Sequence, residues 1–135
     1  MKKNKTLLFA LAALLISLIS GCALPANENK QALYTKISAA AAYKIMKSGD
    51  DFILLDVRTI EEYVEKHIAG AILIPDYEIA SRAEIELTDK DTIILVYCRS
   101  GRRSENAAKE LVEMGYTNVY DFGGIIDWPY GTVSE

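Results

Sequence analysis

The fold of this chain is decided by residues 92–104, which read Thr92-Ile93-Ile94-Leu95-Val96-Tyr97-Cys98-Arg99-Ser100-Gly101-Arg102-Arg103-Ser104. An apolar run leads directly to a cysteine, and such a run between polar residues is typical of a strand buried on both faces. A short polar loop with one glycine follows. Residues 105–114 then place their apolar side chains on one side of a helix, which Gly115 is positioned to end. The pattern predicts a core strand, a loop and a helix.

Cys98 stands at the carboxyl end of the predicted strand, where open α/β sheets bind their ligands. The N–H groups of a tight loop and a helix N-terminus together form an anion site. Arg99, Arg102 and Arg103 add positive charge to it. Both effects favour the thiolate, which is the nucleophilic form of cysteine. We therefore expect Cys98 to be catalytic, and the alternative is a buried structural cysteine beside solvated arginines.

Three separated motifs lie between residues 56 and 128. Cys98, Gly101 and Arg103 form a Cys-x-x-Gly-x-Arg loop. The other two motifs are Asp56-Val57-Arg58 with Glu61-Glu62-Tyr63 and His67-Ile68-Ala69-Gly70-Ala71, and Gly115-Tyr116-Thr117-Asn118-Val119 with Gly123-Gly124 and Trp128. Together they resemble the active-site loop and the two flanking signatures of the rhodanese family of sulfurtransferases.

The resemblance implies an α/β fold of three layers, with a central parallel five-stranded sheet and helices on both faces. It also implies a mechanism without a cofactor. The Cys98 thiolate takes the outer sulfur of a small anionic donor such as thiosulfate, becomes a persulfide, and passes the sulfur to cyanide or a thiol. The expected substrate-binding loop, whose N–H groups stabilise the persulfide, consists of Arg99, Ser100, Gly101, Arg102, Arg103 and Ser104.

Two other functions remain open at this point. A persulfide carrier or redox-sensing module with little turnover needs the same thiolate. Phosphatases of the same fold have a Cys-x5-Arg loop, one residue longer. Here the sixth position after Cys98 is Ser104, and Arg103 stands at the fifth. The shorter loop makes a smaller cradle, which favours a sulfur atom over a phosphate.

Several residues outside the loop are candidates for a supporting role. Asp56 ends a second apolar run and either holds the cysteine loop or is a simple turn residue. Arg58 is expected to pair with Glu62, the alternative being a place near the site. Thr59 and Glu62 fit a capping box. His67 is the only histidine, and we expect it to be structural; one histidine and one free cysteine do not predict a metal site.

The remaining elements are predicted from strand-like runs and helix caps. We expect strands at 34–37, 52–55, 71–74 and 118–121, and helices at 39–47 and 59–66, with a mixed, mostly helical segment at 76–87. Alternating strands and helices indicate a parallel sheet.

The N-terminus has the pattern of a targeting segment. Residues 1–5 are basic, and the apolar run 6–20 is shorter than a bilayer span but fits a signal peptide. Ile19-Ser20-Gly21-Cys22 resembles the bacterial lipobox. The resemblance implies a signal peptide at 1–21, an acylated Cys22, a flexible tether at 22–33 and a rhodanese domain at 34–135. An ordinary secretory signal or an uncleaved anchor is the alternative.

Composition limits the class further. The 135 residues indicate one domain, which we expect to be monomeric, and the net charge of −4 does not support nucleic-acid binding. The chain has two cysteines. If Cys22 carries lipid, Cys98 has no disulfide partner. On the extracytoplasmic side of a bacterial membrane, a free thiol without a function is exposed to oxidation. This favours a chemical role for Cys98 independently of the resemblance.

Overall fold

Five parallel strands form the centre of the computed structural model, which describes residues 33–135. They are β1 (Thr35–Lys36), β2 (Phe52–Asp56), β3 (Ile72–Leu73), β4 (Ile93–Cys98) and β5 (Val119–Gly124). Their spatial order is β1-β5-β4-β2-β3, so β4 is the middle strand. This position explains the apolar run before Cys98, because a central strand has no solvent-facing side.

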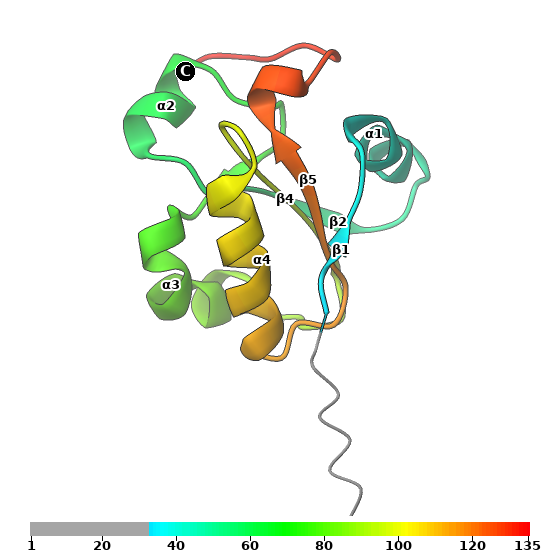
Figure 1. Cartoon of the computed structure of the whole chain (residues 1–135), viewed down its shortest axis with the longest axis vertical. Coiled ribbons are helices and arrows are strands. Elements are labelled where there is room, and N and C mark those ends of the chain that lie inside the picture. Colours follow the sequence, from blue (N-terminus) through cyan, green and yellow to red (C-terminus); the bar gives the residue numbers. More distant parts are fainter. Residues whose placement is uncertain (1–32) are drawn as a thin grey trace, which may run out of the picture. The chain divides into compact units, whose positions relative to one another are not determined.

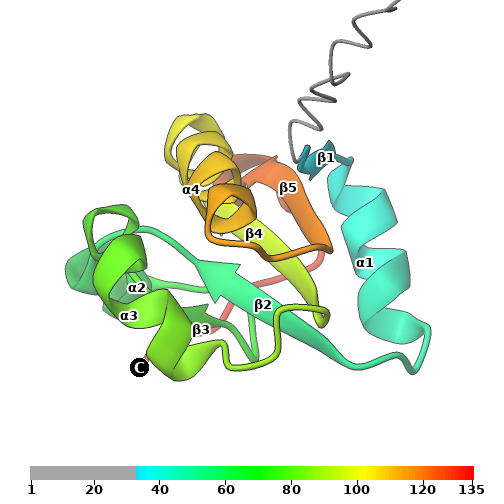
Figure 2. The same ribbon diagram turned by 90° about the horizontal axis from the view of Figure 1, so that it is seen from below.

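Helices cover both faces of the sheet (Figures 1 and 2). Helix α1 (Ala39–Lys47) lies against one face, while α3 (Ile79–Glu86) and α4 (Arg102–Glu113) lie against the other. The shorter α2 (Ile60–Glu65) connects β2 to β3, and the single 3-10 turns η1 (Asp76–Glu78) and η2 (Ile125–Asp127) complete the elements. The predicted fold, a parallel five-stranded sheet with helices on both faces, is confirmed.

The side chains of β4 alternate between two apolar clusters, as the two-residue period of a strand requires. Val96 and Cys98 pack into the cluster beneath α3 and α4. Leu95 and Tyr97 pack into the cluster beneath α1. The cysteine therefore faces the side of the sheet on which α4 begins.

Two predicted helix starts are confirmed in detail. The Ser38 hydroxyl accepts a hydrogen bond from the Ala41 N–H at the start of α1. Thr59 and Glu62 form the expected capping box, in which each side chain accepts from the backbone N–H of the other. Such caps satisfy N–H groups that a helix leaves unpaired at its first turn.

Several element boundaries differ from the prediction, and three of the differences have a clear physical reason. Helix α4 begins at Arg102 rather than at residue 105, because Gly101 adopts a φ of 105° that turns the chain into the helix at once. The strand expected at 71–74 contains only Ile72 and Leu73, since it pairs with β2 alone at the sheet edge. Strand β5 runs three residues further than expected, to Gly124, which pairs with Cys98.

The expected signal peptide at 1–21, the acylation site at Cys22 and the tether, apart from its last residue, lie outside the described residues. Within residues 33–135, no helix has the length and apolar character needed to cross a membrane.

Candidate active site

Cys98 is the last residue of β4, and its sulfur is bound by the loop that follows. The residue is only 1% exposed. The Gly101 N–H donates a hydrogen bond to Sγ at 3.0 Å. The N–H groups of Ser100 and Ser104 also act on the sulfur and lower the pKa of the thiol. The buried thiol thus lies within a ring of amide hydrogens at the start of α4.

Close backbone contact holds this loop in shape. A side chain at Gly124 would place its Cβ 2.3 Å from the Arg99 carbonyl oxygen, so only glycine fits beside the loop. Gly101 has the positive φ that the turn into α4 requires. The two glycines therefore allow β5 and the loop to touch, which keeps the amides directed at Cys98.

The pKa of Cys98 is lowered from its ordinary value by the balance of two opposing effects. Burial is the larger single effect and raises the pKa, because it disfavours the charged form. The backbone and side chain of Ser104, and the backbone N–H groups of Gly101 and Ser100, lower it and together prevail. The sulfur is stabilised as an anion by dipoles rather than by a salt bridge.

Ser104 links the sulfur site to a buried carboxylate that the sequence analysis did not single out. Its hydroxyl lies 2.7 Å from Oδ1 of Asp121, which also accepts from the Gly123 N–H at 3.0 Å. Asp121 is fully buried, and its Oδ2 has no hydrogen-bond partner among residues 33–135. An aspartate between Tyr120 and Phe122 in an apolar strand was the available signal. Asp121 positions Ser104 and so acts on Cys98 indirectly.

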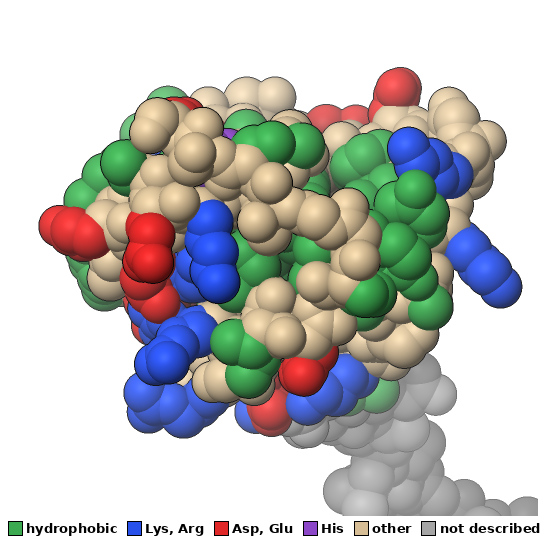
Figure 3. Space-filling model, turned by 90° about the horizontal axis from the view of Figure 1, so that it is seen from above, with side chains coloured by type: hydrophobic (Ala, Val, Ile, Leu, Met, Phe, Trp, Pro, Cys, Tyr) green, Lys and Arg blue, Asp and Glu red, His purple; other side chains and the backbone are tan. Residues whose placement is uncertain are grey.

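The three arginines of the motif are placed differently. Arg99 and Arg102 are exposed. Arg103 donates from both terminal nitrogens to Glu62, at 2.7 and 2.8 Å. Hydrogen bonding from Arg103 lowers the pKa of Glu62 to about 2. Glu62 therefore largely neutralises Arg103, and the free positive charge beside the loop comes from Arg99 and Arg102. Figure 3 shows Lys and Arg side chains beside acidic ones on this face.

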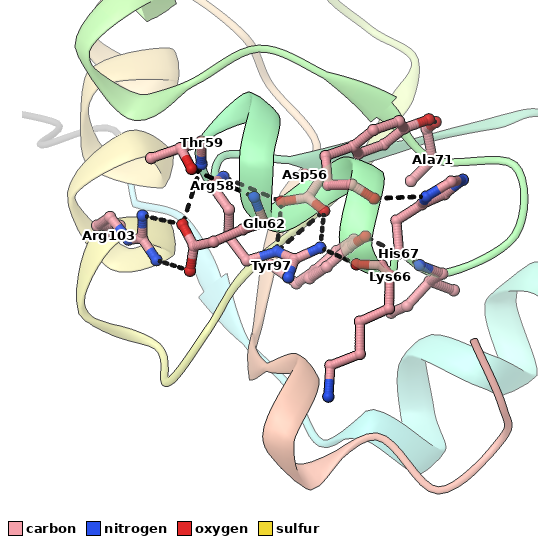
Figure 4. Close-up of polar contacts among 11 residues, drawn as sticks. Asp56, Arg58, Thr59, Glu62, Lys66, His67, Ala71, Tyr97 and Arg103 are labelled. Carbon is pink, nitrogen blue, oxygen red and sulfur yellow. Dashed lines mark hydrogen bonds and ion pairs between the residues drawn. The ribbon is translucent and has the colours of Figure 1, made fainter. Parts of the chain in front are cut away.

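Asp56 and Arg58 form a buried ion pair beside the site (Figure 4). Arg58 Nη2 lies 2.6 Å from Asp56 Oδ2 and 2.7 Å from the Lys66 carbonyl oxygen, and Asp56 Oδ1 accepts from the Arg58 N–H at 2.9 Å. The expected pairing of Arg58 with Glu62 is wrong. Arg58 turns back to the carboxylate two residues earlier, while Glu62 faces α4 and binds Arg103.

His67 and Trp128 lie in packed surroundings. The His67 ring stacks on Tyr63 with centroids 3.9 Å apart, and its Nδ1 is 2.9 Å from the Tyr63 carbonyl oxygen. Trp128 packs on the α1 side of the sheet and lines a cavity of about 670 Å³ with Tyr43 and Tyr130. Within residues 33–135, no three His, Cys, Asp or Glu side chains are grouped as metal ligands would be.

Comparison with known proteins agrees with this geometry. The protein-family model of the rhodanese-like domain matches residues 38–129 of this chain, which include every strand but β1. The chain belongs to the rhodanese-like family.

Relatives of this rhodanese-like chain include proteins named as thiosulfate sulfurtransferases. It is 44% identical over 73 residues to the thiosulfate sulfurtransferase PspE of Escherichia coli, covering 54% of this chain and 70% of the relative. It is 35% identical over 97 residues to the thiosulfate sulfurtransferase GlpE of Coxiella burnetii, covering 71% of this chain and 88% of the relative. A solved structure described as rhodanese with anions, from E. coli, superimposes with a TM-score of 0.60 at 39% identity, over 63% of this chain and all of that one.

Proposed function

We propose that the protein is a sulfurtransferase that takes a sulfane sulfur from thiosulfate, or a similar donor, and passes it to a thiophilic acceptor. The main support is the hydrogen bond from the Gly101 N–H to the Cys98 sulfur at 3.0 Å, together with the lowered pKa of that thiol. The thiosulfate sulfurtransferase names of PspE and GlpE support the choice of donor. We propose further that the domain acts as a monomer.

The reaction proceeds in two displacements. The Cys98 thiolate attacks the outer sulfur of thiosulfate, a sulfur–sulfur bond forms to Sγ, and the original sulfur–sulfur bond breaks with its electron pair leaving on sulfite. The resulting persulfide carries one negative charge on its outer sulfur. The N–H groups around Sγ stabilise this charge as an oxyanion hole stabilises an alkoxide. Cyanide or a thiolate then attacks the outer sulfur, and the electron pair returns to Cys98.

The loop geometry disfavours phosphoryl chemistry. A phosphatase loop needs an arginine at the sixth position, where Ser104 instead directs its hydroxyl to Asp121. The arginine at the fifth position is held by Glu62. Neither residue is available to clamp the equatorial oxygens of a phosphate.

The decisive experiment is the intact mass of the protein after incubation with thiosulfate and removal of excess donor. We expect an adduct of one sulfur atom on Cys98, its release by cyanide as thiocyanate, and ping-pong kinetics. Loading without sustained turnover would instead support a persulfide carrier. Hydrolysis of an aryl phosphate without sulfur loading would overturn the proposal.

We also propose that the protein is anchored by lipid on Cys22 to a bacterial membrane, on its extracytoplasmic side. The support is the Ile19-Ser20-Gly21-Cys22 sequence after a basic and then apolar leader. The mass of the N-terminal peptide of protein purified from bacterial membranes tests this. We expect a diacylated or triacylated Cys22, and release of the protein from the membrane in Cys22→Ser; an unmodified N-terminus in the membrane fraction would contradict it.

A further inference from the structure

A cavity of about 350 Å³ opens beside the Cys98 loop, and neither of the two displacements gives it a role. Its lining combines charged side chains with two isoleucines: Arg58, Glu62, Glu65, Lys66, Arg99, Ile125 and Ile126. The volume falls at the lower end of the range for small-molecule sites, which pair apolar walls with a few polar groups. Cyanide, with two heavy atoms, does not need such a space.

The cavity adjoins the reacting sulfur through the backbone. Arg99 directly follows Cys98, and its carbonyl oxygen accepts from the Ile126 N–H at 3.3 Å. The apolar wall formed by Ile125 and Ile126 continues from Gly124, which pairs with Cys98 in the sheet. A molecule held here lies next to the loop that carries the persulfide.

The charges that line the cavity divide into two groups. Arg58 and Glu62 are occupied within the protein, by Asp56 and by Arg103. Among the described residues, Lys66 and Arg99 form no ion pair, and neither does Glu65. Two cations and one carboxylate are thus left to meet a ligand.

Lys66 is held in place for such contact. Its carbonyl oxygen accepts from the buried Arg58 guanidinium at 2.7 Å, while its side chain extends away from the Asp56–Arg58 pair (Figure 4). The backbone is therefore fixed and the ammonium group is free to bind. Fixing the backbone lowers the conformational entropy lost when a ligand binds.

We propose that this cavity is the acceptor subsite and that it takes a small thiol of amino-acid or short-peptide size, bearing carboxylates and an amino group. The inference rests on the proposed sulfurtransferase function. Lys66 and Arg99 bind the carboxylates, Glu65 binds the ammonium group, and the isoleucines pack against the carbon chain. The acceptor thiol loses its proton to solvent, its sulfur attacks the outer persulfide sulfur, and the Cys98 thiolate leaves, so that the products are a small-molecule persulfide and free enzyme.

Single-turnover discharge of the loaded full-length protein tests the subsite. The acceptors are glutathione, which carries two carboxylates and an ammonium group, and neutral 2-mercaptoethanol. In Lys66→Gln we expect the half-saturating glutathione concentration to rise about tenfold, the loss of one charge-assisted contact. Discharge by 2-mercaptoethanol serves as the internal reference. The control Lys44→Gln removes another exposed lysine, from α1, and is expected to match the wild type.

The possible outcomes separate this inference from the proposed function. An equal shift for both thiols, or none for glutathione, overturns the subsite. A matching shift in the thiosulfate concentration needed for loading assigns the cavity to the donor and also overturns it. Calorimetric binding of S-methylglutathione to the unloaded protein needs no persulfide; binding that Lys66→Gln weakens supports the subsite even if loading fails, and absence of binding counts against it.

Discussion

The turn after β2 and the loop after β4 begin side by side, since Asp56 lies in register with Tyr97, yet they handle charge in opposite ways. In the turn, Asp56 and Arg58 neutralise each other, with side chains 0% and 3% exposed. In the loop, the Cys98 sulfur accepts from the Gly101 N–H, further loop groups lower its pKa, and it has no charged partner in hydrogen-bond contact.

The difference separates a structural site from a reactive one at the same edge of the sheet. The buried ion pair satisfies both charges and leaves little capacity for a ligand. Dipoles from the loop stabilise negative charge on sulfur without covering it with a counter-ion, so the same groups serve thiolate and persulfide alike. Glu62 and Arg103 connect the two regions, because α2 follows the turn and α4 follows the loop.

Removing the reactive group is expected to have the largest effect. Cys98→Ser should reduce thiocyanate formation from thiosulfate and cyanide to the background rate, because no other described residue carries the sulfur. The serine hydroxyl can still accept from the Gly101 N–H, so the melting temperature should change little. Turnover above background, or a sulfur adduct in the intact mass of the variant, would contradict the assignment.

Breaking the structural site should instead cost stability. Asp56→Ala leaves the Arg58 guanidinium buried without its partner, and removal of one member of a buried pair typically costs about 3–5 kcal/mol. Urea unfolding followed by circular dichroism measures this loss. Asp51→Ala, an exposed aspartate just before β2, is the control and should change the free energy of unfolding by less than about 0.5 kcal/mol. Equal stability of the two variants would show that the pair is not a structural support.

The dipoles around the sulfur predict a pH profile. Because the pKa of Cys98 is lowered, the rate of persulfide loading should rise with pH and level off at a lower pH than for an ordinary thiol. Ser104→Ala removes the side-chain hydroxyl that helps to lower this pKa, so the midpoint of the profile should move to higher pH. Stopped-flow loading, or alkylation of Cys98, across the pH range measures it. Ser81→Ala on α3 is the control, and a common midpoint for both variants would remove Ser104 from the sulfur site.

The smallest effect is expected for the link between the two regions. The pKa of Glu62 is lowered to about 2 from its ordinary 4.5, so its contribution to stability is fully present above about pH 4.5 and is lost as pH falls toward 2. Glu62→Gln should destabilise the protein by about 1 kcal/mol at neutral pH, and this difference from wild type should shrink on acidification. Urea unfolding at pH 7 and at pH 3 tests it against Glu113→Gln, whose carboxylate is exposed. A difference that does not depend on pH would contradict the ion pair.

The sequence alone predicted the parallel sheet, the central strand before Cys98, the caps at Ser38 and Thr59, and the cysteine loop itself. Each of these features depends on contacts within a few residues or on the period of the apolar side chains. A short stretch of sequence is therefore enough to predict it. The sequence did not predict the early start of α4, because the arginines after Gly101 show no apolar periodicity, although the glycine permits the turn.

The tertiary structure decided which charged groups meet. Arg103 binds Glu62, 41 positions away, and Ser104 binds Asp121, 17 positions away. Both contacts depend on how the crossovers bring separate strands to one edge, and spacing along the chain does not show that. The order of the strands therefore brought Glu62 to Arg103 and Asp121 to Ser104, whereas the Asp56–Arg58 pair and the amide donor to Cys98 lie within three residues along the chain.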